Sequence, residues 1–249
     1  MNRIKLIIEY DGAAFCGWQI QDGVRTVQQV IEAALERQLG APVRIHPSGR
    51  TDSGVHARGM VAHFDSPLNL PPRAYRDGLN RLLPHDVAIL SAEPVNSEFH
   101  ARFSAAGKWY RYSIWNHPIR SPLQHRRVWH LKGGLDLESM RQAAALLVGE
   151  HDFAAFRAAS CEAKTTVREL FGLELRRKAQ LLQIDVRGSG FLQHMVRVMA
   201  GTLAEVGQGK RTVASVAELL SSGDRDAAGV TAPGAGLCLM EVCYSEGRP

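Results

Sequence analysis

The spacing of apolar residues predicts an irregular succession of strands and helices. Apolar residues stand at every second position from Ile4 to Tyr10, which is the period of a strand with one buried face. Thr26 is suited to cap a helix over residues 27–39, and Gly40 is suited to end it. The other expected elements are a strand at 43–46, a helix that follows Pro71-Pro72 and ends before Pro84, a strand at 108–116, a helix up to residue 148 capped by Asp136, a hairpin of 166–176 and 181–187, a helix at 191–206 and a last strand at 237–244.

The order of these elements predicts two halves, residues 1–104 and 105–249, with the break near Ser104 to Gly107. Each half would hold strands around one or two helices. Strands and helices do not alternate strictly along the chain, which favours an α+β fold with a mainly antiparallel sheet over a doubly wound fold.

The composition is that of a folded protein. Hydrophobic residues make up 45% of the 249 residues and charged residues 22%, which excludes a disordered or collagen-like chain. No apolar run approaches the roughly 18 residues that span a bilayer, and Glu9 comes too early for a signal peptide. The 4 cysteines are scattered without a Cys-x-x-Cys pair, which argues against a disulfide framework. A reduced, cytoplasmic protein is the simplest interpretation.

The charge is distributed unevenly. The net charge of +5 alone indicates a polyanionic partner only weakly, but the window from Phe99 to Lys132 contains no Asp or Glu and holds most of the tryptophans. Cations attract phosphates and aromatic rings stack on unpaired bases, so this composition is typical of binding to single-stranded or loop RNA. An amphipathic strand with a solvated basic face and a buried aromatic face would explain the same window.

Several nucleotide and metal motifs are incomplete. Gly188-Ser189-Gly190 has Gln193 where a dinucleotide fingerprint has its third glycine. The run from Gly207 to Thr212 follows an expected helix and lacks the Gly-Lys-Ser/Thr of a P-loop. No Cys or His set has metal-ligand spacing, and the hydrolase motif Gly-x-Ser-x-Gly is absent. None of these motifs therefore indicates a dinucleotide, P-loop, metal or hydrolase site.

One dense polar loop remains, from Ser48 to His56. Gly49 and Gly54 allow sharp turns and close approach of a ligand to the backbone. Asp52 lies between them beside Arg50, and a neighbouring guanidinium keeps a carboxylate ionised. A fixed, ionised carboxylate can serve as a nucleophile or base. An ordinary surface turn, with Asp52 bonded to its local backbone, is the alternative.

Arg197 is the second candidate. Met195, Met199 and Leu203 belong to one apolar stripe of the expected helix. At about 100° per residue Arg197 lies off that stripe and points away from the core. The pattern leaves open whether it points into solvent or into a cleft.

The motifs that contain these residues resemble those of a known protein family. The loop from Gly49 to His56 closely resembles the catalytic loop of the tRNA pseudouridine synthase A (TruA) family. The resemblance extends along nearly the whole chain, through motifs in the same order: Phe99 to Ala105, Tyr110-Arg111-Tyr112, Gly190 to Arg197 with Gly201-Thr202-Leu203, and Ala232-Pro233 with Gly236-Leu237.

The resemblance implies a fold and an activity. Two ferredoxin- or RRM-like α+β halves would share a mainly antiparallel sheet with a basic central cleft. The enzyme would convert uridine to pseudouridine at positions 38, 39 and 40 of the tRNA anticodon stem-loop. The N-glycosidic bond would break, and a C–C bond would form from uracil C5 to ribose C1′. The resemblance further implies a homodimer that needs no cofactor or metal.

It also implies roles for particular residues. Asp52 would be the nucleophile, and Arg197 would keep it ionised. Arg50 would help to extrude the target nucleotide, which must leave its stack before the chemistry, and Tyr110 would pack on the target base. Two segments would contact tRNA: Phe99, His100, Ala101, Arg102 and Phe103, and Ser160, Cys161, Glu162, Ala163 and Lys164.

One position departs from the family pattern. Ser53 stands where the family usually has alanine, and its extra hydroxyl could change local hydrogen bonds. Two other functions remain open at this point. One is an RNA-binding module with an inactive site. The other is an Asp-dependent hydrolase, although such enzymes usually gather several acids around a metal.

Overall fold

The computed structural model describes residues 2–244, which fold as two compact units. The first unit combines residues 2–106 with residues 239–244, and the second holds residues 107–238. Each contains strands and helices, and the strands pair mainly in the antiparallel sense. The predicted α+β class with a mainly antiparallel sheet is confirmed.

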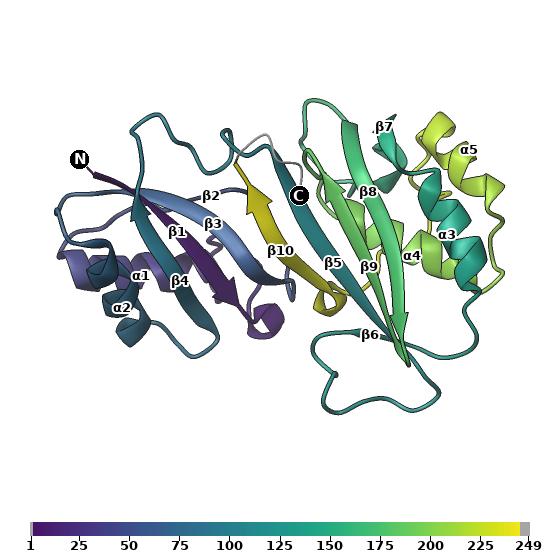
Figure 1. Cartoon of the computed structure of the whole chain (residues 1–249), viewed down its shortest axis with the longest axis horizontal. Helices are drawn as coiled ribbons and strands as arrows, with labels where there is room; N and C mark the ends of the chain where they lie inside the picture. Colours follow the sequence, from purple (N-terminus) through teal and green to yellow (C-terminus); the bar gives the residue numbers. More distant parts are fainter. Residues whose placement is uncertain (1, 245–249) are drawn as a thin grey trace. The chain divides into compact units, whose positions relative to one another are not determined.

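The first unit builds its sheet in the order β4-β1-β3-β10, and β2 pairs with β3 (Figure 1). Helices α1 and α2 pack against each other, and α2 packs on β4. The elements are β1 (Asn2–Tyr10), a 3-10 turn (Gly12–Ala14), α1 (Val27–Leu39), β2 (His46–Pro47), β3 (His56–Ser66), α2 (Pro72–Leu82), β4 (Val87–Pro94) and β10 (Leu237–Cys243).

Helix α1 shows why the local sequence determines these boundaries. The Thr26 hydroxyl accepts a hydrogen bond from Gln29 N (3.4 Å), which satisfies one of the free N–H groups of the first turn. Gly40 has a φ of 74° and ends the helix in the left-handed conformation. Ile31 and Leu35 are fully buried on the inner face. The expected helix is confirmed in full.

The second unit orders its strands β5-β9-β8-β7, and β6 pairs in parallel with β5. Helix α3 packs on β8, and α4 packs on both α3 and β5. The elements are β5 (Gly107–Asn116), β6 (Trp129–Leu131), α3 (Leu137–Ala145), β7 (Gly149–Asp152), a 3-10 turn (Ala154–Phe156), β8 (Val167–Lys178), β9 (Leu181–Gly188), α4 (Met195–Gly207), α5 (Ala214–Ser222) and a 3-10 turn (Gly234–Gly236).

Three expected elements differ from those observed. The helix expected up to residue 148 ends at Ala145. The helix expected from residue 191 begins at Met195, because His194 has a φ of 64° and cannot continue a right-handed helix. The strand expected at 43–46 is reduced to His46–Pro47. The hairpin of β8 and β9 is confirmed, as is the Asp136 cap, whose carboxylate accepts from the backbone of Glu138.

The sequence predicts that residues 105–249 form one continuous C-terminal half. In the structure, residues 239–244 at the end of the last strand belong to the first unit instead. Cys243 O accepts a hydrogen bond from Ala106 N (2.8 Å), and Met240 O lies so close to Gly59 that a Cβ there would stand 2.6 Å from it. These contacts hold β10 in the sheet of the first unit. Over residues 2–244, no helix is both long and apolar enough to cross a membrane.

Candidate active site

The predicted nucleophile, Asp52, lies half-buried in the Asp52 loop (residues 48–55), which connects β2 to β3. Asp52 O accepts a hydrogen bond from Val55 N (3.2 Å), which closes a tight turn. Gly54 adopts a φ of 76° within that turn, a conformation that side chains disfavour. The neighbouring Thr51 is buried, and its hydroxyl shares a 2.8 Å hydrogen bond with Tyr10 on β1.

A second segment, residues 12–18, packs against the Asp52 loop. Trp18 N donates to Thr51 O (3.0 Å), and Gly54 N donates to Phe15 O (3.2 Å). Gly17 has a φ of +89°, and a Cβ there would lie 2.7 Å from Thr51 O and 3.3 Å from Asp52 C. The backbones therefore meet at a distance that only glycine permits. This contact makes the backbone around Asp52 rigid, as a preorganised reactive group requires.

Arg50 and Ser53, which lie on either side of Asp52 in the motif, are both exposed. Arg50 is exposed, so its guanidinium is accessible to a ligand. Ser53 is also exposed, and its Oγ donates to Phe15 O (3.4 Å). The Ser53 hydroxyl thus adds one bond to residues 12–18.

The 99–103 segment lies in the first unit after β4. Ala101 is buried, whereas Arg102 is exposed and Phe103 is 76% exposed. The guanidinium carbon of Arg102 lies 5.7 Å from the centre of the Phe103 ring, and the His100 ring lies 4.3 Å from it. A cation and an accessible aromatic ring are therefore presented together, a combination suited to phosphate and base.

Tyr110 belongs to β5 in the second unit. It is 8% exposed, and the Phe191 ring meets it edge-on at 5.1 Å. Tyr112, two residues along, is fully buried on the same face, and its hydroxyl donates to Pro233 O (2.8 Å). The Tyr110 side chain is therefore fixed by packing within its own unit.

Arg197 lies near the start of α4 and is half-buried. Its Nε donates to Ala232 O (2.8 Å), and its own O accepts from Ala232 N (3.2 Å). The backbone of Ala232 thus orients Arg197, which lies 35 residues earlier in the chain. The helix pattern left open whether Arg197 points into solvent or into a cleft. The observed side chain does not extend freely into solvent.

The second predicted tRNA segment, residues 160–164, precedes β8. Ser160, Glu162 and Lys164 are exposed, and Cys161 and Ala163 are half-buried. Cys161 N donates to Ala158 O (3.0 Å), which forms a turn at its start. The segment therefore presents mainly polar side chains to the surface of the second unit.

The sequence pattern did not single out Asp185, a fully buried carboxylate on β9. It accepts hydrogen bonds from Arg111 Nε (2.8 Å) and Nη2 (3.0 Å) and from Trp109 Nε1 (2.8 Å). An acid from another strand thus neutralises part of the acid-free window. Tyr110 and Tyr112 are buried on the face of β5 opposite to Arg111. This part of the acid-free window is therefore an amphipathic strand, which was the alternative explanation of its composition.

In the described part of the chain, no group of three or more His, Cys, Asp and Glu side chains has the arrangement of a metal site. The polar loop carries one carboxylate, that of Asp52, on a tight turn. With exposed cations and an exposed aromatic ring elsewhere in the same unit, this arrangement is suited to nucleophilic or general-base chemistry on an anionic substrate.

A family model described as tRNA pseudouridine synthase matches residues 6–104 and 143–245. The chain belongs to the tRNA pseudouridine synthase family and is an enzyme of the isomerase class. It is 56% identical to "tRNA pseudouridine synthase A" of Syntrophotalea carbinolica over 98% of this chain and 97% of that protein. It is 57% identical to the protein of the same name from Citrifermentans bemidjiense over 99% of both, and 51% identical to that of Geobacter sulfurreducens over 98% of this chain and 100% of that protein.

Proposed function

We propose that the enzyme isomerises uridine to pseudouridine at positions 38, 39 and 40 of the tRNA anticodon stem-loop, with Asp52 as the nucleophile and without a cofactor or metal. It would act in the cytoplasm as a homodimer. The observation that carries the proposal is the glycine contact between Gly17 and the Asp52 peptide, which places one acid on a rigid turn. The family membership supports tRNA as the substrate class.

The reaction is a balanced rearrangement. The glycosidic C1′–N1 bond breaks, C5 of the same uracil forms the new bond to C1′, and the proton on C5 moves to N1 through the site or solvent. No electron acceptor and no second substrate are required. Asp52 would stabilise the separated fragments by a temporary covalent bond, and Arg197 would contribute positive charge to the reaction.

The remaining roles concern the substrate. Exposed Arg50 would contact the tRNA and help to extrude the target nucleotide, at an unstacking cost of a few kcal/mol. Tyr110 would pack on the extruded base. The 99–103 segment and residues 160–164 would hold the tRNA, and the exposed pair of Arg102 and Phe103 supports this role for the first of them.

The test uses an unmodified tRNA transcript with uridine at the three positions. Wild type, Asp52→Ala and a control variant Asp22→Ala, which changes an exposed acid of the same unit, are incubated with it in EDTA, and pseudouridine is mapped. We expect product from wild type and the control and a loss of at least ~10³-fold in Asp52→Ala, as for removal of other catalytic nucleophiles. Product from Asp52→Ala at the wild-type rate would exclude this nucleophile. tRNA binding without product from any variant would instead favour an inactive RNA-binding module.

A further inference from the structure

Strand β3 presents a buried histidine toward the 99–103 segment. His63 is 2% exposed, and its neighbour Phe64 points to the opposite face, where it meets Tyr75 of α2. Three aromatic rings surround the His63 imidazole: His46 stacks on it at 5.1 Å, His100 meets it at 4.7 Å, and Phe99 meets it edge-on at 6.0 Å. Phe99 and His100 directly precede Ala101 in sequence, so the imidazole packs against the start of the segment.

The imidazole also forms a hydrogen bond to the middle of the segment. Nδ1 of His63 accepts from Ala101 N at 3.2 Å. The carbonyl of Ala101 accepts from the Tyr244 hydroxyl at 2.6 Å. Both backbone groups of a fully buried residue are therefore satisfied by side chains, and neither group belongs to a sheet or a helix.

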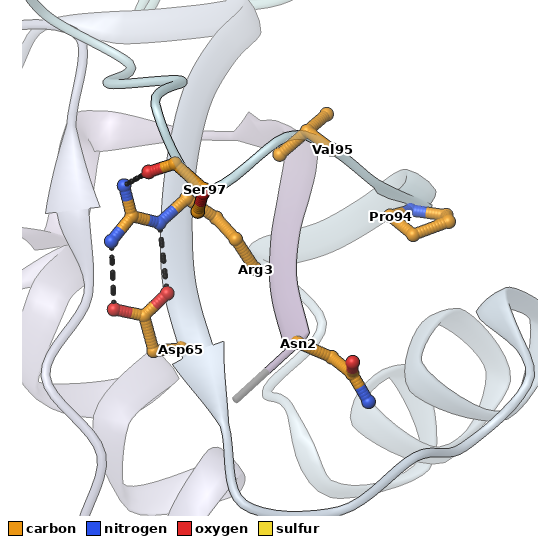
Figure 2. A pocket seen from close by; sticks show the side chains of 6 residues that line it. All are labelled: Asn2, Arg3, Asp65, Pro94, Val95 and Ser97. Atoms are coloured by element: carbon orange, nitrogen blue, oxygen red, sulfur yellow. Dashed lines mark hydrogen bonds and ion pairs between the residues drawn. The ribbon is translucent and has the colours of Figure 1, made fainter.

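A second contact holds the start of the segment. Asp65 lies two residues beyond His63 on the same face of β3 and pairs with Arg3 of β1 through two 2.8 Å bonds. Arg3 Nη1 in turn donates to Phe99 O (3.0 Å) and to Ser97 O. Figure 2 shows this guanidinium between the Asp65 carboxylate and the Ser97 carbonyl.

From this geometry we infer that His63 is a positioning residue for tRNA: it acts through Ala101 to hold the 99–103 segment in the conformation that presents Arg102 and Phe103. The inference rests on the proposed RNA-binding role of that segment. His63 itself is buried and does not touch the substrate. Burial, together with the nearby charges of His100, His46 and Arg3, lowers the pKa of His63 to about 4. The ring is therefore neutral near pH 7 and can act as the acceptor that the Ala101 N–H requires.

Loss of this acceptor leaves a buried N–H without a partner. The segment then exchanges among conformations, and only a fraction of molecules presents the binding side chains correctly. Molecules in the other conformations bind tRNA without the contacts of Arg102 and Phe103, so the apparent affinity for tRNA falls as the presenting fraction falls. The chemistry on bound tRNA involves other groups, so its rate is expected to stay the same.

The experiment compares two substitutions at one position. In His63→Gln the amide oxygen can still accept from Ala101 N, and in His63→Leu no acceptor remains. Arg102→Ala removes one presented side chain, and His85→Gln, which changes an exposed histidine of the same unit, is the matched control. KM and kcat for pseudouridine formation and the Kd for tRNA are measured for each variant and for the double variant of His63→Leu with Arg102→Ala.

We expect His63→Leu to raise KM and Kd at least ~5-fold with kcat within ~2-fold of wild type, and His63→Gln to recover most of the loss. The loss of affinity in the double variant should be smaller than the product of the two single losses, because molecules that do not present the segment have already lost the Arg102 contact. Unchanged KM in His63→Leu, a loss in kcat alone, or multiplied effects in the double variant would overturn the inference. If Arg102→Ala binds tRNA normally, the RNA role of the segment fails, which is a failure of the proposed function itself.

A direct measurement covers the case in which His63→Leu does not fold. Hydrogen exchange across residues 97–103 is followed in wild type and in His63→Gln. Slow exchange of the Ala101 amide in both is expected, since each supplies an acceptor. Rapid exchange of that amide in wild type would overturn the inference.

Discussion

The contact between Gly17 and the Asp52 loop allows a quantitative prediction. In Gly17→Ala, the new Cβ lies 2.7 Å from Thr51 O and 3.3 Å from Asp52 C, on a residue with a φ of +89°. Gly23→Ala is the matched control, because Gly23 has a φ of +75° but nothing within 4 Å of its would-be Cβ. Both variants incur the left-handed backbone penalty of about 1–2 kcal/mol, whereas only Gly17→Ala adds an overlap with another backbone.

Overpacking of this kind costs a further ~1–3 kcal/mol. The free energy of unfolding of Gly17→Ala should therefore fall below that of Gly23→Ala by at least ~1 kcal/mol. A backbone shift that relieves this overlap moves the Asp52 peptide. A misplacement of a catalytic group by about 1 Å can reduce a rate ~10²-fold. Gly17→Ala should accordingly lose activity that Gly23→Ala retains.

Urea unfolding of both variants gives the difference in stability, and single-turnover pseudouridine formation on saturating tRNA gives the rate without the binding step. The reasoning would be refuted if both variants lost the same stability and Gly17→Ala kept the wild-type rate. In that case the contact around Gly17 would have no influence on the nucleophile.

Three further predictions concern other parts of the molecule. Asp185→Asn should lower the free energy of unfolding by about 2–4 kcal/mol in urea, because the buried partner of Arg111 loses its charge. Tyr112→Phe should cost about 1 kcal/mol by the same measurement, since Pro233 O loses its donor. Folding lowers the pKa of His63 from 6.5 to about 4, so the neutral ring contributes stability above pH 6.5 that is lost as the pH falls toward 4. Wild type should therefore lose up to ~3 kcal/mol relative to His63→Gln across that interval, and parallel pH profiles of the two proteins would contradict this.

The elements that were predictable are those with local signals. Thr26 and Gly40 mark the ends of α1 by capping chemistry that depends only on neighbouring residues. Strand β3 was not predicted, because most of its side chains are buried on both faces and the period of two disappears. The start of α4 differs from the prediction for another reason: His194 has a left-handed φ of 64°, and the apolar pattern carries no signal for it.

The functional site shows the same division. Asp52 could be proposed from the sequence because two glycines and Arg50 lie close to it in the chain. The support from Gly17 could not be found, because it joins segments more than thirty residues apart through backbone atoms, which have no side-chain signature. His63 was missed for a similar reason, since its partner is the N–H of Ala101. Asp185 lies on another strand than the cations that it neutralises, so the charge pattern along one segment could not include it.

The placement of β10 has a consequence for synthesis on the ribosome. The first unit contains the N-terminal strands and also residues 239–244, so its sheet is complete only after almost the whole chain has been translated. Domains usually fold as they emerge, the N-terminal one first. Here the edge of β3 that receives β10 stays open while the entire second unit is made. A nascent chain halted before residue 239 would expose that edge. Chaperones could bind the open edge, and it could also pair with the same edge of a neighbouring chain on the same messenger RNA.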